Sequence, residues 1–158
     1  MKKMLLALVC GVSLIMPRSE YNEYENVESS FDHSVQIEVI IDDNSLVFNK
    51  GTYEYNGILN EFKKMIFNSH EVPSLGVSLD ELTREEKKKG VWIEFKFNEI
   101  SYSRDMPFES LLVNVNLDFY GFNVIRKYEG KYEGRTYYIN LVNNMDNLYY
   151  YLVNNYGY

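Results

Sequence analysis

The stretch VWIEFKF, residues 91–97, alternates apolar and polar side chains with the two-residue period of a β-strand. Four large apolar side chains share one face: Val91, Ile93, Phe95 and Phe97. The opposite face carries a different set: Trp92, Glu94 and Lys96. The first face predicts a strand that packs against a hydrophobic core, and the second face places an indole beside a carboxylate.

Further strands and helices are expected on both sides of this segment along the chain. Strand-like patterns recur at residues 35–41, 45–49, 109–116, 121–128 and 132–141. Helix-like patterns occur at residues 53–69, 82–90 and 145–155. Short links between consecutive strands favour antiparallel pairing. We therefore expect one α+β domain over residues 34–158, with a mostly antiparallel sheet of five to six strands and helices packed on one face.

The repeated stretch KYEGKYEG, residues 127–134, predicts a β-hairpin. A two-residue turn at Glu129–Gly130 places Arg126 opposite Glu133, a favourable cross-strand pair. A turn at residues 133–134 instead leaves the apolar strand ends without partners. The first register is expected, with a basic and aromatic tip that could bind a partner. Its two strands then share an apolar face: Phe122, Val124, Tyr137 and Ile139.

Residues 1–19 have the layout of a secretory signal. Lys2 and Lys3 precede an uncharged, mostly apolar run, Met4–Met16. This run is shorter than the roughly 20 residues of a membrane-spanning helix. An acidic spacer is expected to follow over residues 20–33. The alternative interpretation is a cytosolic protein with an uncleaved apolar N-terminus.

Cys10 is the only cysteine of the chain. The apolar residues before it and Gly11 after it resemble a bacterial lipobox, although Val9 stands where that signal normally has a small residue. A secreted form would contain no disulfide. We expect an extracytoplasmic protein, secreted or membrane-tethered, that meets a membrane only through its N-terminal segment if that segment is retained or lipidated.

The acidic composition argues against nucleic acid as a partner. The formal net charge is −7, and residues 1–19 hold basic but no acidic side chains, so the rest of the chain is more acidic still. Nucleic-acid binding requires a basic surface that neutralises phosphates. The expected partner is an unidentified protein or an envelope ligand.

The sequence lacks the motifs of metal and cofactor chemistry. His33 and His70 are the only histidines, and neither lies in a spaced metal-binding motif. The chain has no P-loop, no dinucleotide-binding glycine motif and no GxSxG nucleophile motif. We therefore expect no cofactor and no metal ion, and a non-catalytic role is favoured.

Glu94 provides the one catalytic alternative, a carboxylate-based hydrolase. A carboxyl group beside the indole of Trp92 could have a raised pKa and act as a general acid. The second carboxylate would then come from Glu99, Asp105 or Glu109.

The Trp92 face and the hairpin tip together form the candidate binding surface. Tryptophan and tyrosine side chains contribute much of the free energy of protein interfaces. The same face of the sheet could instead be covered by the C-terminal helix. The candidate residues are Trp92, Glu94, Lys96, Arg126, Tyr128, Tyr132, Arg135 and Tyr138.

Overall fold

The computed structural model describes residues 22–24, 26–72 and 76–157, and of residues 22–24 only the backbone pairing. The signal-like segment of residues 1–19, with Cys10, lies outside the described residues. Export and lipidation therefore stay predictions from the sequence.

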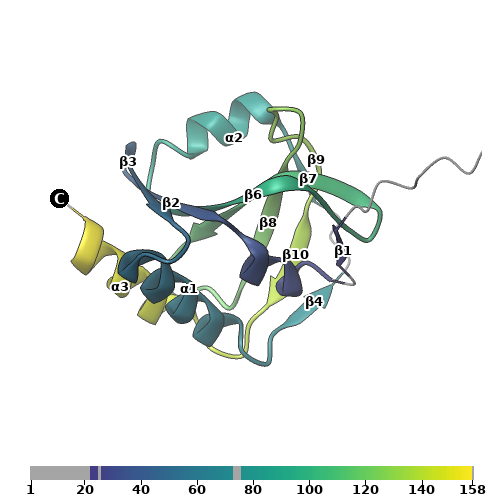
Figure 1. Cartoon of the computed structure of the whole chain (residues 1–158). Coiled ribbons are helices and arrows are strands. Elements are labelled where there is room, and N and C mark those ends of the chain that lie inside the picture. Colours follow the sequence, from purple (N-terminus) through teal and green to yellow (C-terminus); the bar gives the residue numbers. More distant parts are fainter. Residues whose placement is uncertain (1–21, 25, 73–75, 158) are drawn as a thin grey trace, which may run out of the picture.

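A curved antiparallel sheet forms the centre of the molecule (Figure 1). Its strands are β2 (Gln36–Ile41), β3 (Asn44–Asn49), β4 (His70–Val72), β6 (Val91–Ser103), β7 (Met106–Val115), β8 (Gly121–Lys127) and β10 (Tyr137–Asn140). Within the described residues these seven strands lie in the order β3-β2-β6-β7-β8-β10-β4. Two smaller ladders flank them: β1 (Asn22–Tyr24) pairs in parallel with β6, and β5 (Val77–Ser78) pairs with β9 (Gly134–Arg135). The predicted α+β class with a mostly antiparallel sheet is confirmed.

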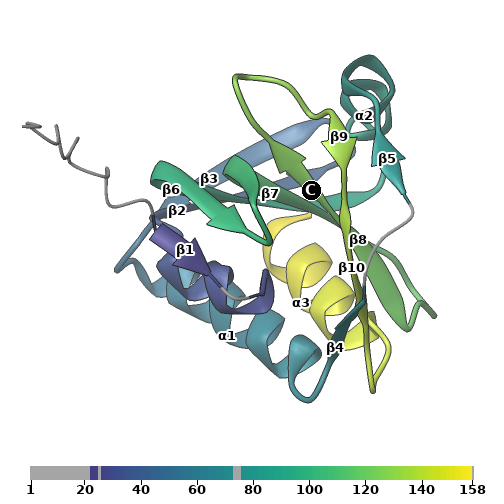
Figure 2. The same cartoon turned by 90° about the vertical axis from the view of Figure 1, so that its right-hand side faces the viewer.

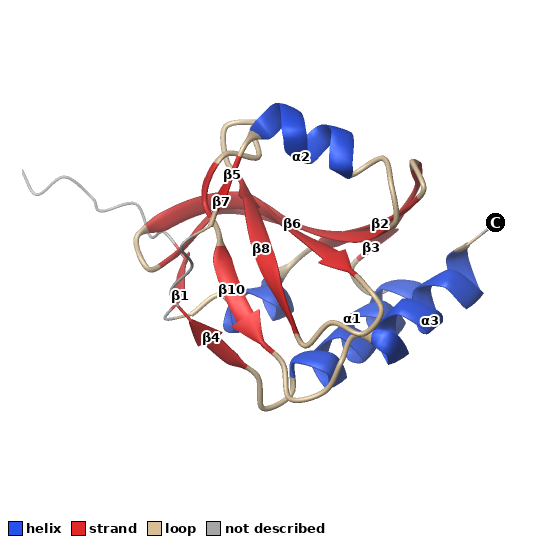
Figure 3. Cartoon of the chain, turned by 180° about the vertical axis from the view of Figure 1, so that it is seen from behind, coloured by secondary structure: helices blue, strands red, loops and turns tan. Residues whose placement is uncertain are grey.

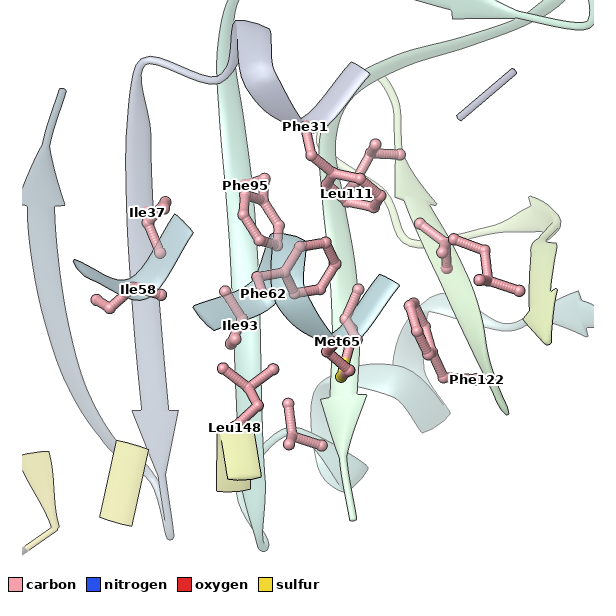
Figure 4. Packing of buried hydrophobic residues seen from close by; sticks show 14 of the residues in the cluster. Phe31, Ile37, Ile58, Phe62, Met65, Ile93, Phe95, Leu111, Phe122 and Leu148 are labelled. Atoms are coloured by element: carbon pink, nitrogen blue, oxygen red, sulfur yellow. The ribbon is translucent and has the colours of Figure 1, made fainter. Parts of the chain in front are cut away.

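Two α-helices, α1 (Tyr53–Ile66) and α3 (Asp146–Tyr156), and a short 3-10 helix, η1 (Glu28–His33), pack on one face of this sheet (Figure 2). Four side chains at helical spacing form the buried face of α1: Tyr55, Ile58, Phe62 and Met65. Phe62 lies with its ring centroid 4.7 Å from that of Phe95 on β6 and 4.6 Å from that of Phe31 on η1 (Figure 4). The apolar face predicted for residues 91–97 therefore lines the main core.

Helix α2 (Asp80–Glu86) lies across the opposite face of the sheet (Figure 1, Figure 3). Beneath it a second, smaller cluster of buried side chains contains Ile40, Trp92, Leu112 and Tyr132. The expectation of an open Trp92 face is therefore wrong, because α2 and the hairpin remove these apolar surfaces from water. The C-terminal helix does not provide this cover, since α3 buries Leu148 and Leu152 in the main core.

The folded domain begins earlier than the predicted boundary at Ser34. Val27 is fully buried and Phe31 is 1% exposed, and both belong to the main core. The backbone N–H of Val27 also donates to Glu71 Oε2 at 2.8 Å. The later part of the predicted spacer is thus a core segment, because both apolar side chains belong to the main core and Phe31 packs against rings of α1 and β6.

The hairpin turn lies where the repeated stretch places it. Tyr128 and Lys131 exchange two backbone hydrogen bonds of 3.0 Å each. Between them Glu129 and Gly130 have φ angles of 49° and 76°, the left-handed conformation of a type I′ turn. The predicted position of the turn is confirmed.

The register beyond the turn differs from the prediction by two residues. Tyr137 pairs with Val124 and Ile139 pairs with Phe122, whereas the simple hairpin would place Tyr137 opposite Phe122. The extra length is taken up by residues 132–136, of which Gly134 and Arg135 pair with β5 instead of β8. A shift of two residues preserves the face of every side chain. The predicted apolar face of Phe122, Val124, Tyr137 and Ile139 is therefore buried in the main core.

Candidate functional site

Glu94 is the most deeply buried carboxylate among the described residues, with 1% of its surface exposed. Three side chains donate hydrogen bonds to it. Ser110 Oγ lies 2.5 Å from Oε1, and Lys87 Nζ lies 2.8 Å from Oε2. Tyr132 Oη lies 2.9 Å from Oε1 and 2.8 Å from Oε2. Both carboxylate oxygens are thus bound by groups from a neighbouring strand, the C-cap of α2 and the hairpin.

The environment of Glu94 holds its carboxyl group ionised. Burial raises its pKa, but the charge of Lys87 and the hydrogen bonds of Lys87, Ser110 and Tyr132 outweigh burial, so the pKa lies below its ordinary value. The expectation of a raised pKa beside Trp92 is therefore wrong. A raised pKa would require an apolar environment around the carboxylate. Instead the ammonium group of Lys87 lies beside it.

Three cationic side chains lie close to the aromatic ring of Tyr132. Lys87 Nζ, Arg84 Cζ and Lys127 Nζ lie 5.1, 5.2 and 5.4 Å from the centroid of its ring. Cations at this distance from an aromatic ring are attracted by its quadrupole. Burial, together with the charge of Glu94 beside its hydroxyl, raises the pKa of Tyr132. The phenol therefore stays protonated and donates to Glu94.

Two hydrogen bonds attach α2 to the hairpin tip. Asp80 Oδ1 accepts from the backbone N–H of Tyr132 at 2.8 Å, and Arg84 donates to the carbonyl oxygen of Gly130 at 2.7 Å. Asp80 and Arg84 also form an ion pair of 2.9 Å along the helix. With the bond from Lys87 to Glu94, these contacts fix α2 over the second face of the sheet.

A second carboxylate, Glu38, lies directly across the strand pair from Glu94. Lys96 Nζ lies 2.7 Å from Glu38 Oε2, and Ser45 donates a short hydrogen bond to Oε1. Burial raises the pKa of Glu38, but these two partners outweigh it and lower the pKa overall. Each of the two neighbouring carboxylates is therefore neutralised by its own lysine.

A hollow of about 390 Å³ opens beside Glu94 where β6 bulges. The pairing of β6 with β7 shifts register between Lys96 and Ser101. Two of the three carboxylates expected near Glu94 line this hollow: Glu99 and Glu109. Asp105 does not, since it lies in the turn between β6 and β7.

Arg126 does not make the predicted pair with Glu133. Its side chain is buried and donates to the carbonyl oxygens of Arg135 and Pro107 at 2.8 and 2.6 Å. Glu133 lies 3.8 Å from Lys131 instead. The two-residue register shift explains the difference, because the return strand leaves β8 before it reaches Arg126.

The structure separates the remaining candidate residues. Trp92 is buried, and its Nε1–H donates to the carbonyl oxygen of Lys89 at 2.8 Å. Tyr138 packs over Gly121, where a Cβ would lie 2.5 Å from its hydroxyl. Tyr128 is half-buried at the hairpin tip, and Arg135 is exposed on β9. Four of the eight candidates, Trp92, Glu94, Arg126 and Tyr132, are thus buried beneath the surface they were expected to form.

His33 and His70 are both exposed, one at the end of η1 and the other on the edge strand β4. Among residues 22–24, 26–72 and 76–157, no group of three or more histidine, cysteine, aspartate or glutamate side chains could hold a metal ion. In the same part of the chain no helix is both long and apolar enough to cross a bilayer.

The sequence reasoning missed Lys87 and Ser110, which complete the Glu94 site. Lys87 belongs to the run EEKKKG, whose charge order is typical of a solvated helix end. Ser110 stands at a polar position of a strand. Neither position carries a signal by itself, because their roles depend on where α2 crosses the sheet. Comparison with protein families, curated proteins and solved structures finds no match to this chain.

Proposed function

We propose that this chain is a small exported binding module of the bacterial envelope or extracellular space, without catalytic activity of its own. Its partner is a protein or an envelope ligand. Export is supported by the signal-like layout of residues 1–19. An acidic net charge of −7 disfavours nucleic acid and anionic lipid surfaces as partners.

The hydrogen bonds around Glu94 are the observation that carries the non-catalytic role. A general acid must exchange its proton near the working pH. Glu94 instead has a lowered pKa, and Lys87, Ser110 and Tyr132 bind its two oxygens. Such an arrangement supports a structural role, in which the ion pair holds α2 on the sheet.

The binding surface is the solvent-facing side of α2 and the hairpin tip, and we name it the α2–hairpin surface. It consists of β5, α2 and the hairpin tip, residues 128–133. Tyr128 belongs to this tip, and Arg135 lies beside β5 through the β5–β9 ladder. The buried candidates lie beneath it and fix its shape.

Cell fractionation with mass spectrometry of the mature N-terminus tests the exported state. We expect the full chain, expressed in a bacterial host, to reach the envelope or medium and to start after the apolar run or at a lipidated Cys10. A chain that stays in the cytosol and begins at Met1 would contradict export and favour the cytosolic alternative.

A second experiment tests the absence of catalysis. The purified protein and its Glu94→Gln variant are assayed side by side against panels of ester, peptide and glycoside substrates. We expect no turnover by either protein. Turnover that Glu94→Gln abolishes, in a variant that remains folded by circular dichroism, would replace the binding module with a carboxylate hydrolase.

A further inference from the structure

An outward-facing apolar ridge runs along β5 and the beginning of α2. We name it the α2 ridge; its members Val77, Leu79 and Leu82 are 64%, 60% and 55% exposed. The residue that α2 buries is instead Thr83, which is 3% exposed. A surface helix normally turns its apolar side chains toward the core. Helix α2 has the reverse arrangement, with Leu82 and the N-cap Leu79 exposed to water and Thr83 buried.

A hollow lies on each side of the α2 ridge. The first, of about 180 Å³, is lined by Ile125 of β8 and by Thr136. The second, of about 510 Å³, lies toward the hairpin tip and is lined by Lys131. Leu79 and Leu82 line both hollows, so they stand as a ridge between two depressions. A partner segment could lie across this ridge and place one side chain in each hollow.

Each hollow also has a carboxylate without a cationic partner. Glu81 lines the hollow toward the hairpin tip, and Glu86 lines the hollow toward β8. Both are exposed, and neither forms an ion pair with another described residue. Asp80 differs from them, because it is paired with Arg84 at 2.9 Å. The two carboxylates without an ion-pair partner place negative charge on the rim of the ridge.

The ridge is held in one position before any partner arrives. Asp80, Arg84 and Lys87 bind the hairpin and the sheet through hydrogen bonds of 2.8, 2.7 and 2.8 Å. A surface that is already ordered loses little conformational entropy on binding.

We propose that the α2 ridge docks a protein segment whose aliphatic side chains are flanked by lysine or arginine. The aliphatic side chains cover Leu79 and Leu82 and enter the two hollows. The flanking cations pair with Glu81 and Glu86. This inference rests on the proposed function, because it names the partner class of that binding module.

The test uses the whole protein and a synthetic peptide of alternating leucine and lysine. Binding is measured by fluorescence anisotropy, and the site is mapped by amide chemical shifts in ¹⁵N-labelled protein. We expect saturable binding with shifts confined to residues 76–86 and 128–133. Peptides that alternate leucine with glutamate, or serine with lysine, should bind at least about tenfold more weakly, a difference of about 1.4 kcal/mol.

The apolar part of the proposal is tested by Leu79→Ser combined with Leu82→Ser. Both side chains are exposed, so the fold is expected to persist, and we expect the affinity to fall about tenfold or more. The matched control combines Val142→Ser with Tyr150→Ser, since these side chains are 61% and 52% exposed outside the ridge. The control should bind the peptide as the unchanged protein does.

The charged part is tested by Glu81→Gln combined with Glu86→Gln. We expect weaker binding of the leucine–lysine peptide and a smaller dependence on salt, because two ion pairs are lost. Glu54→Gln combined with Asp118→Asn removes the same charge from exposed positions elsewhere and should change neither quantity.

Three outcomes would overturn the docking proposal: no binding of the leucine–lysine peptide, equal binding of the serine–lysine peptide, or unchanged affinity in the Leu79 and Leu82 double variant. The localisation experiment separates this failure from failure of the proposed function. An exported chain that does not bind the peptide keeps the module and rejects the ridge. A cytosolic chain that binds it through the ridge keeps the ridge and rejects export.

Discussion

Among single residues, Lys87 is expected to have a large effect on stability, because it neutralises a buried carboxylate. Its Nζ lies 2.8 Å from Glu94, whose side chain is 2% exposed. Removing one partner of a buried pair typically costs about 3–5 kcal/mol, since an uncompensated charge stays behind. We therefore expect Lys87→Met to lower the free energy of unfolding in urea by about 3 kcal/mol.

The control for this prediction is the adjacent lysine. Lys88 pairs with Glu85 at 2.7 Å, but both side chains are exposed, so Lys88→Met should cost much less stability than Lys87→Met. Adding Glu94→Gln to Lys87→Met should recover part of the loss, because the orphaned charge is removed. Equal losses for Lys87→Met and Lys88→Met would show that the Glu94 pair does not hold α2 on the sheet.

The lowered pKa of Glu94 also determines how the free energy of unfolding should depend on pH. Its folded-state pKa lies below the unfolded value of about 4.3. The stabilisation it gives is therefore present above that unfolded value and is lost as the pH falls through the folded-state pKa. We expect the free energy of unfolding to decline below about pH 4.3 and to decline less steeply in Glu94→Gln. Glu54→Gln, at an exposed site, should leave the slope unchanged.

The sequence could single out Glu94 but could not supply its surroundings. The two-residue period of residues 91–97 correctly places Glu94 on the same face as Trp92. Its partners are 7, 16 and 38 residues away in sequence, namely Lys87, Ser110 and Tyr132. Which of them reaches the carboxylate depends on the path of α2, and no local pattern determines that path.

At the scale of elements, the packing of α1 against α3 explains a glycine inside a helix. A Cβ at Gly57 would lie 2.4 Å from the hydroxyl oxygen of Tyr151 on α3. Alanine favours a helix over glycine by about 1 kcal/mol, but this contact opposes that gain. We expect Gly57→Ala to destabilise the protein in urea unfolding, because Tyr151 must move.

The same Gly57→Ala substitution in a Tyr151→Phe protein tests whether the Tyr151 hydroxyl causes the destabilisation. In Tyr151→Phe the hydroxyl is absent, so Gly57→Ala should become neutral or stabilising by up to about 1 kcal/mol. The reference for this comparison is Tyr151→Phe alone. A Gly57→Ala substitution that is stabilising in both backgrounds would remove the close approach of α1 and α3 as the reason for the glycine.

Elements with a strong local period were predictable, and those held by distant contacts were not. The buried face of α1 follows directly from its 3.6-residue spacing. Helix α2 was expected over residues 82–90, but it begins at Asp80 and ends at Glu86, and Thr83 is buried inside it. Asp80 instead binds the backbone of Tyr132, 52 residues away. The same distant contact draws residues 132–136 out of the simple hairpin register.

For the molecule as a whole, the main error of sequence reasoning is the position of its N-terminal boundary. Val27 and Phe31 stand in an acidic stretch and show neither a helical nor a strand period. Their burial depends on distant parts of the chain, since Phe31 packs on Phe62 of α1 and Phe95 of β6, and the N–H of Val27 binds Glu71 of β4. An isolated pair of apolar residues in a polar segment can therefore belong to a core.

This boundary predicts which truncations the fold tolerates. Phe31 contacts the rings of Phe62 and Phe95 at 4.6 and 4.8 Å between centroids. Burying a phenylalanine typically contributes about 3–5 kcal/mol relative to alanine. We expect a chain that starts at Asn22 to unfold in urea as the full chain does, and a chain that starts at Ser34 to be less stable by at least that amount.

Phe31→Ala in the full chain should reproduce most of the loss, and Asp32→Ala, at an exposed neighbour, should not. Equal stability of the two truncated chains would return the boundary to Ser34. A loss confined to the Ser34 chain has a consequence for export as well, because signal cleavage must then fall before Val27 for the mature protein to keep its core.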